Sequence, residues 1–242
     1  AIQFVDSSDR QAVTDLIKMN GLVDVVIPRG GAGLIQAVVQ NATVPVIETG
    51  IGVCHTYVDA GADYDMARAI AINAKVQRPA VCNAMETLLV HEDAAAEFLP
   101  QMLTEYFAAG VTIIGCGKTQ AFDKRIQAAT EADWATEYGD LRLSVKIVSG
   151  LEEALAHIAK YGTKHSECIV TSDYNHARTF QQRVDAAAVY VNASTRFTDG
   201  FEFGFGAEIG ISTQKLHARG PMALPELTSS KYLISGDGQI RG

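Results

Sequence analysis

Short apolar runs alternate with amphipathic stretches along most of the chain. Buried strands are predicted at the apolar runs 24–27, 44–47, 86–91, 111–114, 145–148, 166–171 and 188–191. Helices are predicted from apolar positions on one face at 9–19, 34–40, 63–74, 93–109, 118–129, 151–160 and 175–184. Strands that alternate with helices are typical of a parallel α/β sheet.

The pattern changes near the C-terminus. Glycines recur between residues 199 and 210, and such a run lets backbone approach a ligand or another chain closely. Beyond it, residues 225–228 predict a short helix and residues 231–235 predict a strand.

The composition excludes several classes of protein. The chain has 242 residues and is 48% hydrophobic, which suits one large or two small domains. A formal net charge of −8 argues against a nucleic-acid partner. No apolar run is long enough to span a bilayer. Cys54, Cys82, Cys116 and Cys168 lie too far apart for a zinc motif, so we expect no metal, and free thiols in a reducing compartment such as the cytoplasm.

A glycine turn is the first candidate for ligand binding. Gly30 and Gly31 stand between a predicted strand and a predicted helix, and Arg29 precedes them. Amides at a helix N-terminus suit a phosphate or pyrophosphate. The alternative is a simple tight turn, and the spacing leaves both readings open because it is not a full GxGxxG.

Three longer stretches carry a family resemblance. They are IPRGGAGL at 27–34, NAKVQRPAVCNAMETLL at 73–89, and VNASTRFTDG at 191–200 with STQKLHARGP at 212–221. Together they resemble γ-glutamyl phosphate reductase, the proline-biosynthesis branch of the aldehyde dehydrogenase superfamily. The resemblance spans the whole chain and falls on the C-terminal part of longer family members.

The resemblance implies an α/β, aldehyde-dehydrogenase-like fold in three parts. Residues 1–80 would form the C-terminal part of the NADPH-binding domain, residues 81–205 the catalytic thiol domain, and residues 206–242 a return segment with an oligomerisation strand. It also implies a homodimer or larger homo-oligomer in which the strand at 231–235 crosses to the neighbouring subunit. The alternative is a strand that completes its own subunit's sheet.

The resemblance also implies a reaction, the NADPH-dependent reduction of L-glutamyl 5-phosphate to L-glutamate 5-semialdehyde with release of phosphate. Cys82 would be the nucleophile, since a thiolate attacks an acyl phosphate and leaves a thioester that accepts hydride. An isolated cysteine is more often an inert buried residue, and we assign Cys54, Cys116 and Cys168 to the core on that ground.

Residues that lie near Cys82 in sequence, or in the stretches that carry the resemblance, are candidates to assist the thiol. Asn83 would add an oxyanion donor to the backbone N–H of Cys82. His217 would donate a proton to the leaving phosphate or the thiohemiacetal oxygen, unless it is a structural histidine. Lys75 and Arg78 would lower the pKa of the Cys82 thiol.

The cofactor would lie against Arg29, Gly30 and Gly31, with Glu137 on the nicotinamide ribose. Glu137 is alternatively a solvated loop carboxylate. Glu48 stands near the position of the superfamily's general base, although a reductase that releases an aldehyde has little need of one.

The substrate carries a carboxylate, an amine and an acyl phosphate. The polar residues expected to bind it follow the strand at 188–191 or lie in the second half of the third stretch, namely Asn192, Ser194, Thr195, Arg196 and Arg219. Arg196 or Arg219 would clamp an anionic group through two hydrogen bonds. The rival functions are another acylating aldehyde dehydrogenase and a catalytically silent module that folds and dimerises.

Overall fold

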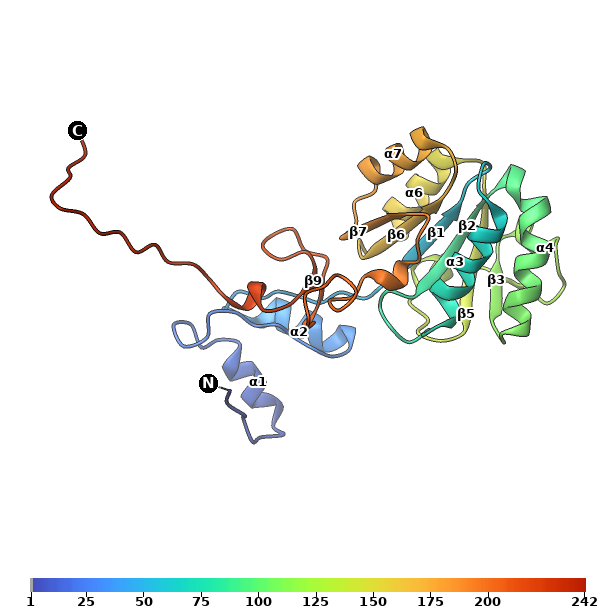
Figure 1. Cartoon of the computed structure of the whole chain (residues 1–242). Coiled ribbons are helices and arrows are strands. Elements are labelled where there is room, and N and C mark those ends of the chain that lie inside the picture. The colour runs from blue at the N-terminus through green and yellow to red at the C-terminus, as the bar shows by residue number, and fades with distance from the viewer. Residues whose placement is uncertain (1) are drawn as a thin grey trace.

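A parallel sheet of seven strands forms the body of the molecule in the computed structural model, which describes residues 2–242 (Figure 1). In chain order the strands are β1 (Cys54–Val58), β2 (Met85–His91), β3 (Thr112–Gly115), β4 (Gln127–Ala128), β5 (Arg142–Val148), β6 (Ser166–Val170) and β7 (Ala188–Val191). Across the sheet they lie in the order β4-β3-β5-β2-β1-β6-β7, and every pairing is parallel. The predicted α/β fold class is therefore confirmed.

Helices cover both faces of this sheet. Helices α3 (Tyr64–Val76) and α4 (Glu92–Ala108) pack on one face, and α6 (Leu151–Tyr161) and α7 (Tyr174–Arg183) pack on the other (Figure 1). Alternate residues of a strand point to opposite faces, so Leu88 packs against α3 and α4 while Leu89 packs against α6 and α7. Because both faces are covered, the central strands are buried along their length rather than on alternate residues, and their polar side chains, such as His55 and Glu86, are buried as well.

Both ends of the chain form an arm beside the sheet. The first segment contributes α1 (Arg10–Leu16) and α2 (Ala32–Asn41), and the last contributes a hairpin of β8 (Gly210–Ser212) and β9 (Gly220–Met222). A small apolar cluster in which Ile47 packs with Met222 joins the two segments. Residues far apart in sequence thus meet at one edge of the molecule (Figure 1).

Several predicted elements were wrong. The strands expected at 24–27 and 44–47 reduce to one bridge between Val26 and Val46, because no third strand among residues 2–242 extends that pairing. The helix expected at 118–129 ends after α5 (Gly117–Gln120), since the Asp123 carboxylate accepts the Arg125 N–H in a turn. The segment 231–235 is extended and exposed, and forms no ladder within the described part of the chain.

Strand β1 was missed by sequence reasoning. His55 and Thr56 make it look polar, yet both side chains are fully buried. The remaining short elements are the 3₁₀ turns η1 (Glu131–Ala135), η2 (Thr195–Phe197) and η3 (Pro225–Leu227), the last of which was expected as a helix at 225–228. Because β1 and α3 belong to the sheet layer, we propose that the domain boundary expected at residue 80 lies nearer residue 53.

Within residues 2–242, no helix combines the length and the apolar character that a membrane crossing requires.

The buried side chain of His157, on α6, packs among aromatic rings. The His157 ring lies 5.4 Å from the Trp134 ring and 4.6 Å from the Tyr161 ring, measured between centroids. Neither of its ring nitrogens has a hydrogen-bond partner among the described residues. Burial lowers the pKa of His157 to about 3, so the ring is neutral in the folded protein.

This burial makes stability dependent on pH. The unfolded chain binds a proton on His157 below about pH 6.5 while the folded chain stays neutral, so stability falls as the pH falls from 6.5 towards 3. We predict that His157→Phe reduces the loss of unfolding free energy between pH 7 and pH 4.5 by on the order of 2 kcal/mol. Urea unfolding at the two pH values measures it. The exposed His217→Gln is the control, and equal pH dependence of His157→Phe and the parent chain would contradict the prediction.

Candidate active site

Cys82 lies in a loop between α3 and β2, at the amino ends of the central strands. The helix runs to Val76, Pro79 lies in the loop, and Met85 begins the strand. The loop faces a cavity of about 600 Å³. The sequence-predicted residues that line it are Arg29, Gly30, Gly31, Arg78, Cys82, Asn83, Glu137 and Arg196. The structure thus brings together residues from the arm and the sheet layer.

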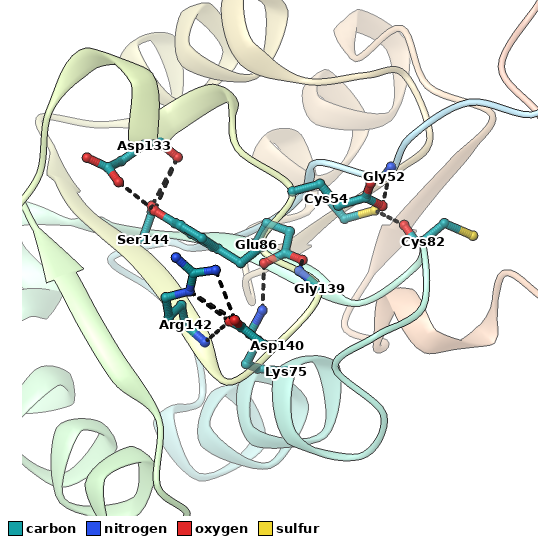
Figure 2. A network of polar contacts seen from close by, with 12 residues as sticks. Gly52, Cys54, Lys75, Cys82, Glu86, Asp133, Gly139, Asp140, Arg142 and Ser144 are labelled. Carbon is teal, nitrogen blue, oxygen red and sulfur yellow. Dashed lines mark hydrogen bonds and ion pairs between the residues drawn. The ribbon is translucent and has the colours of Figure 1, made fainter. Parts of the chain in front are cut away.

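The backbone of Cys82 is held closely on one side. Its carbonyl oxygen accepts the Cys54 S–H at 3.2 Å. The backbone of Gly52 also presses on it, since a Cβ added to Gly52 would lie 1.6 Å from that oxygen. The Gly52 N–H in turn donates to the Glu137 carboxylate at 2.8 Å. Figure 2 shows the hydrogen bond between Cys54 and Cys82, with the Cys82 sulfur projecting away from Cys54.

The environment of the thiol opposes ionisation. Burial is the largest cause and raises the pKa of Cys82 to about 11, with further contributions from the negative charges of Glu208 and Glu137. The backbone N–H of Cys82 and the positive charge of Arg29 act in the opposite direction. The structure therefore holds Cys82 as a neutral thiol at pH 7.

The structure does not place Lys75 where it could lower this pKa, whereas Arg78 lines the same cavity as Cys82. The side chain of Lys75 is fully buried and its ammonium lies 2.6 Å from the Glu86 carboxylate (Figure 2). That carboxylate also accepts the Gly139 N–H at 3.2 Å. Lys75 is thus occupied by an internal ion pair, and Arg29 is the cation that favours the thiolate.

Asn83 ties the Cys82 loop to the segment that carries Arg196. Its side-chain nitrogen donates to the carbonyls of Arg196 at 3.3 Å and Thr198 at 2.9 Å. Its own carbonyl accepts the Thr195 hydroxyl at 2.8 Å. Both N–H groups of the Asn83 side chain are therefore engaged, which removes it as an oxyanion donor in this arrangement.

Guanidinium groups gather on one part of the cavity wall. Arg29, Arg78 and Arg196 all line it. Arg196 donates to the Gln77 side chain at 2.8 Å, and burial, together with the nearby Arg78 charge, lowers the pKa of Arg196. Cations held close to one another favour a bound anion between them.

Some sequence-predicted residues lie outside the cavity. Asn192 bonds the backbone N–H and carbonyl of Thr171, at 2.9 and 3.0 Å, at the carboxyl end of the sheet. Ser194 caps the turn η2, and Thr195 contacts the site only through Asn83. These three residues shape the loop rather than line the site.

The candidates from the return segment are also outside it. Arg219 pairs with the Asp185 carboxylate at 2.8 Å, and His217 is exposed. Glu48 exchanges two hydrogen bonds with Gln214, at 3.0 and 3.1 Å, and lines no part of the cavity. Roles for Arg219 and His217 on the substrate, and for Glu48 as a base, therefore find no support in this geometry.

Sequence reasoning missed other lining residues. Thr49, Thr198, Asp199 and Glu208 all line the cavity. The glycine-rich run at 199–210 was the available signal for the last two, because it marked close approach of backbone to a ligand.

The charge of Glu208 provides a test of this electrostatic account. Glu208→Gln keeps the acceptor that holds the Gly200 N–H but removes the negative charge. We expect the pKa of Cys82 to fall and its alkylation by iodoacetamide at pH 8 to become about threefold faster, as half a pKa unit implies. Peptide mass spectrometry gives the rate at Cys82. Glu226→Gln, which lies outside the cavity, is the control, and an unchanged or slower rate for Glu208→Gln would refute the account.

Known proteins resemble this chain along its whole length, although no family model matches it. It is 66% identical to the γ-glutamyl phosphate reductase of Moorella thermoacetica and 62% identical to that of Clostridium acetobutylicum, each time over 100% of this chain and 58% of the relative.

Solved structures agree with these relatives. The crystal structure of γ-glutamyl phosphate reductase from Thermotoga maritima matches with a TM-score of 0.96 and 53% identity, over 99% of this chain and 58% of that one. An acetylating aldehyde dehydrogenase from Geobacillus thermoglucosidasius matches at a TM-score of 0.61 and 19% identity, over 78% of this chain and 50% of that one, and shares the fold alone. The chain spans 58% of the length of the reductases it matches, and within that span it belongs to the γ-glutamyl phosphate reductase family.

Proposed function

We propose that this chain carries the thiol centre of an NADPH-dependent reduction of L-glutamyl 5-phosphate to L-glutamate 5-semialdehyde, a step of proline biosynthesis. The observation that carries the proposal is the position of Cys82, in a cavity that three arginines also line. The relatives' shared name supports the choice of substrate. The four free thiols support a reducing, cytoplasmic setting.

The thiol performs the first chemical step. Its sulfur bonds to the acyl carbon, the carbon–oxygen bond to phosphate breaks, and a thioester remains on Cys82. Because the pKa of Cys82 is raised to about 11, the proton must pass to a base, and the carboxylates of Glu137 and Glu208 are the bases in the same cavity. After reduction, the thiohemiacetal on Cys82 collapses to the aldehyde and the free thiol.

The arm fits the phosphates of a dinucleotide. Gly31 precedes α2 without a side-chain cap, and together with Gly30 and Arg29 it lines the cavity. Unscreened amides at a helix N-terminus next to a guanidinium suit an anion. NADPH, when bound, supplies the hydride that reduces the thioester. Arg29, Gly30 and Gly31 would hold its phosphates, and Glu137 would lie near its ribose.

The cavity offers both signs of charge to the substrate. Arg78 and Arg196 suit the phosphate and the α-carboxylate, and Asp199 and Glu208 suit the α-ammonium group. This division explains why carboxylates line a site that binds an anionic substrate. On this proposal Arg196 binds the substrate and Arg219, which pairs with Asp185 outside the cavity, does not.

The rival functions differ in what they require of Cys82. Another acylating aldehyde dehydrogenase would use the same thiol, and the fold likeness to such an enzyme at 19% identity allows it. A silent, dimerising module would not use the thiol at all.

The nucleophile is tested in a protein that spans the full length of the relatives. We predict that Cys82→Ser lowers phosphate-dependent oxidation of glutamate 5-semialdehyde by at least about a thousandfold, because serine is a far weaker nucleophile at neutral pH. Absorbance of NADPH measures the rate, and circular dichroism confirms folding. Cys116→Ser is the control. Near-normal turnover of Cys82→Ser would sink the assignment.

We also propose that the C-terminal segment joins two copies of the chain. Residues 229–242 run away from the body as an exposed tail that pairs with no strand among residues 2–242 (Figure 1). Tyr232, Leu233 and Ile234 are 89%, 84% and 91% exposed, which costs free energy in water unless another surface covers them. Pairing with a second subunit would satisfy both the backbone and these side chains.

The assembly proposal predicts a change in mass. Deletion of residues 231–242 should convert a dimer to a monomer in sedimentation velocity, while the circular dichroism of the sheet layer stays unchanged. Replacing Tyr232 and Ile234 by serine, which keeps the chain length, should weaken the dimer in the same direction. A deleted chain that still sediments as the dimer would exclude this segment as the assembly element.

A further inference from the structure

The carbonyl group of Cys82 is held by two neighbours that the proposed chemistry does not use. One is Cys54, whose S–H donates to the Cys82 oxygen at 3.2 Å. The other is Gly52, whose Cα leaves no room for a side chain against that oxygen. Both belong to the segment 52–54, which leads into β1 at the centre of the sheet.

Cys54 is suited to be a permanent donor. Its side chain is fully buried, and burial together with the Glu167 charge raises the pKa of Cys54 well above its ordinary value. This environment favours the neutral thiol, which is the form that carries the S–H. The charged and titratable groups that face it are Glu167, Glu86, Cys82 itself and the His165 ring, whose Nδ1 lies 3.8 Å from the sulfur.

Gly52 is fixed in turn by Glu137. The Gly52 N–H donates to the Glu137 carboxylate at 2.8 Å, and the next residue, Val53, donates to the Thr163 hydroxyl at 3.0 Å. The buried Glu86 carboxylate supports the loop of Glu137 through the Gly139 N–H (Figure 2). The backbone N–H groups of Gly52 and Val53 are thus both held by side chains just before Cys54.

We propose that Cys54 and Gly52 are positioning residues for Cys82, which hold its carbonyl so that the sulfur projects into the cavity and away from the sheet. The proposal rests on the proposed role of Cys82 as the nucleophile. It gives Glu137 a further task, because the carboxylate that faces the cavity also anchors Gly52. It also explains the choice of cysteine at position 54, since a buried apolar residue of similar size would leave the Cys82 carbonyl without this donor.

The matched variants Cys54→Ala and Cys54→Ser test the donor. Both remove the sulfur, but serine keeps a hydroxyl that can donate to the Cys82 carbonyl. Burial is the largest cause of the raised pKa of Cys82, so release of the loop should expose the thiol. We expect iodoacetamide to alkylate Cys82 at least about threefold faster in Cys54→Ala, with its pH–rate curve moved to lower pH. Cys54→Ser should stay within about twofold of the parent chain.

Cys168→Ala provides the control for lost volume, because Cys168 is equally buried in the adjacent strand β6 and has no hydrogen bond to Cys82 among the described residues. Peptide mass spectrometry reads the rate at Cys82 alone. Equal rates for Cys54→Ala and Cys54→Ser, or the same acceleration in Cys168→Ala, would overturn the role of Cys54.

A second pair tests the Gly52 anchor and does not touch the buried core. Glu137→Gln and Glu137→Ala both remove the negative charge, but only glutamine can still accept the Gly52 N–H. We expect Glu137→Ala to be alkylated at least about threefold faster than Glu137→Gln. Equal rates would overturn the role of Gly52. Alkylation needs neither substrate nor cofactor, so these results stand apart from the reductase assay of Cys82→Ser.

Discussion

The parallel pairing of β1 with β2 is the constraint on which the site depends. Both strands lie at the centre of the sheet with helices on each face, so neither can slide without exposing a buried row of side chains. Their register brings the residues before β1 next to the loop before β2. Gly52 and Cys54 thereby meet the carbonyl of Cys82, and a contact in the core sets the geometry of a residue at the surface of a cavity.

The same region carries an expensive buried charge pair. Lys75 and Glu86 lie 2.6 Å apart with almost no exposed surface, and ion pairs of this kind seldom add stability over apolar residues of equal size. What the pair provides is a fixed acceptor for the Gly139 N–H, at the loop from which Glu137 reaches Gly52. Burying these charges costs free energy, but the pair fixes one arrangement of the loop that carries Glu137. Buried polar groups are thought to favour one arrangement of a protein in this way.

The sequence was sufficient for the parallel α/β fold class and for most of its strands, and insufficient where tertiary contacts decide. Strand β2 and helix α4 could be predicted from the spacing of their apolar residues. Strand β1 escaped that reasoning since His55 finds its partner in Glu167, 112 residues away in sequence. Likewise Asn83 and Arg196 were both candidates by resemblance. Periodicity does not reveal that the Asn83 side chain donates a hydrogen bond to the Arg196 carbonyl.

The difference between Arg196 and Arg219 shows the limit most clearly. Both belong to the stretches that carry the family resemblance, and both were candidates to clamp an anion. Arg219 is neutralised by Asp185, which also pairs with Lys164 and Lys215, so this cluster fastens the return segment to the sheet layer. Arg196 instead donates to the neutral Gln77 side chain, has no ion pair among the described residues, and lines the cavity together with Arg78 and Asp199. A guanidinium is therefore structural or functional according to the counter-charge that the fold places beside it.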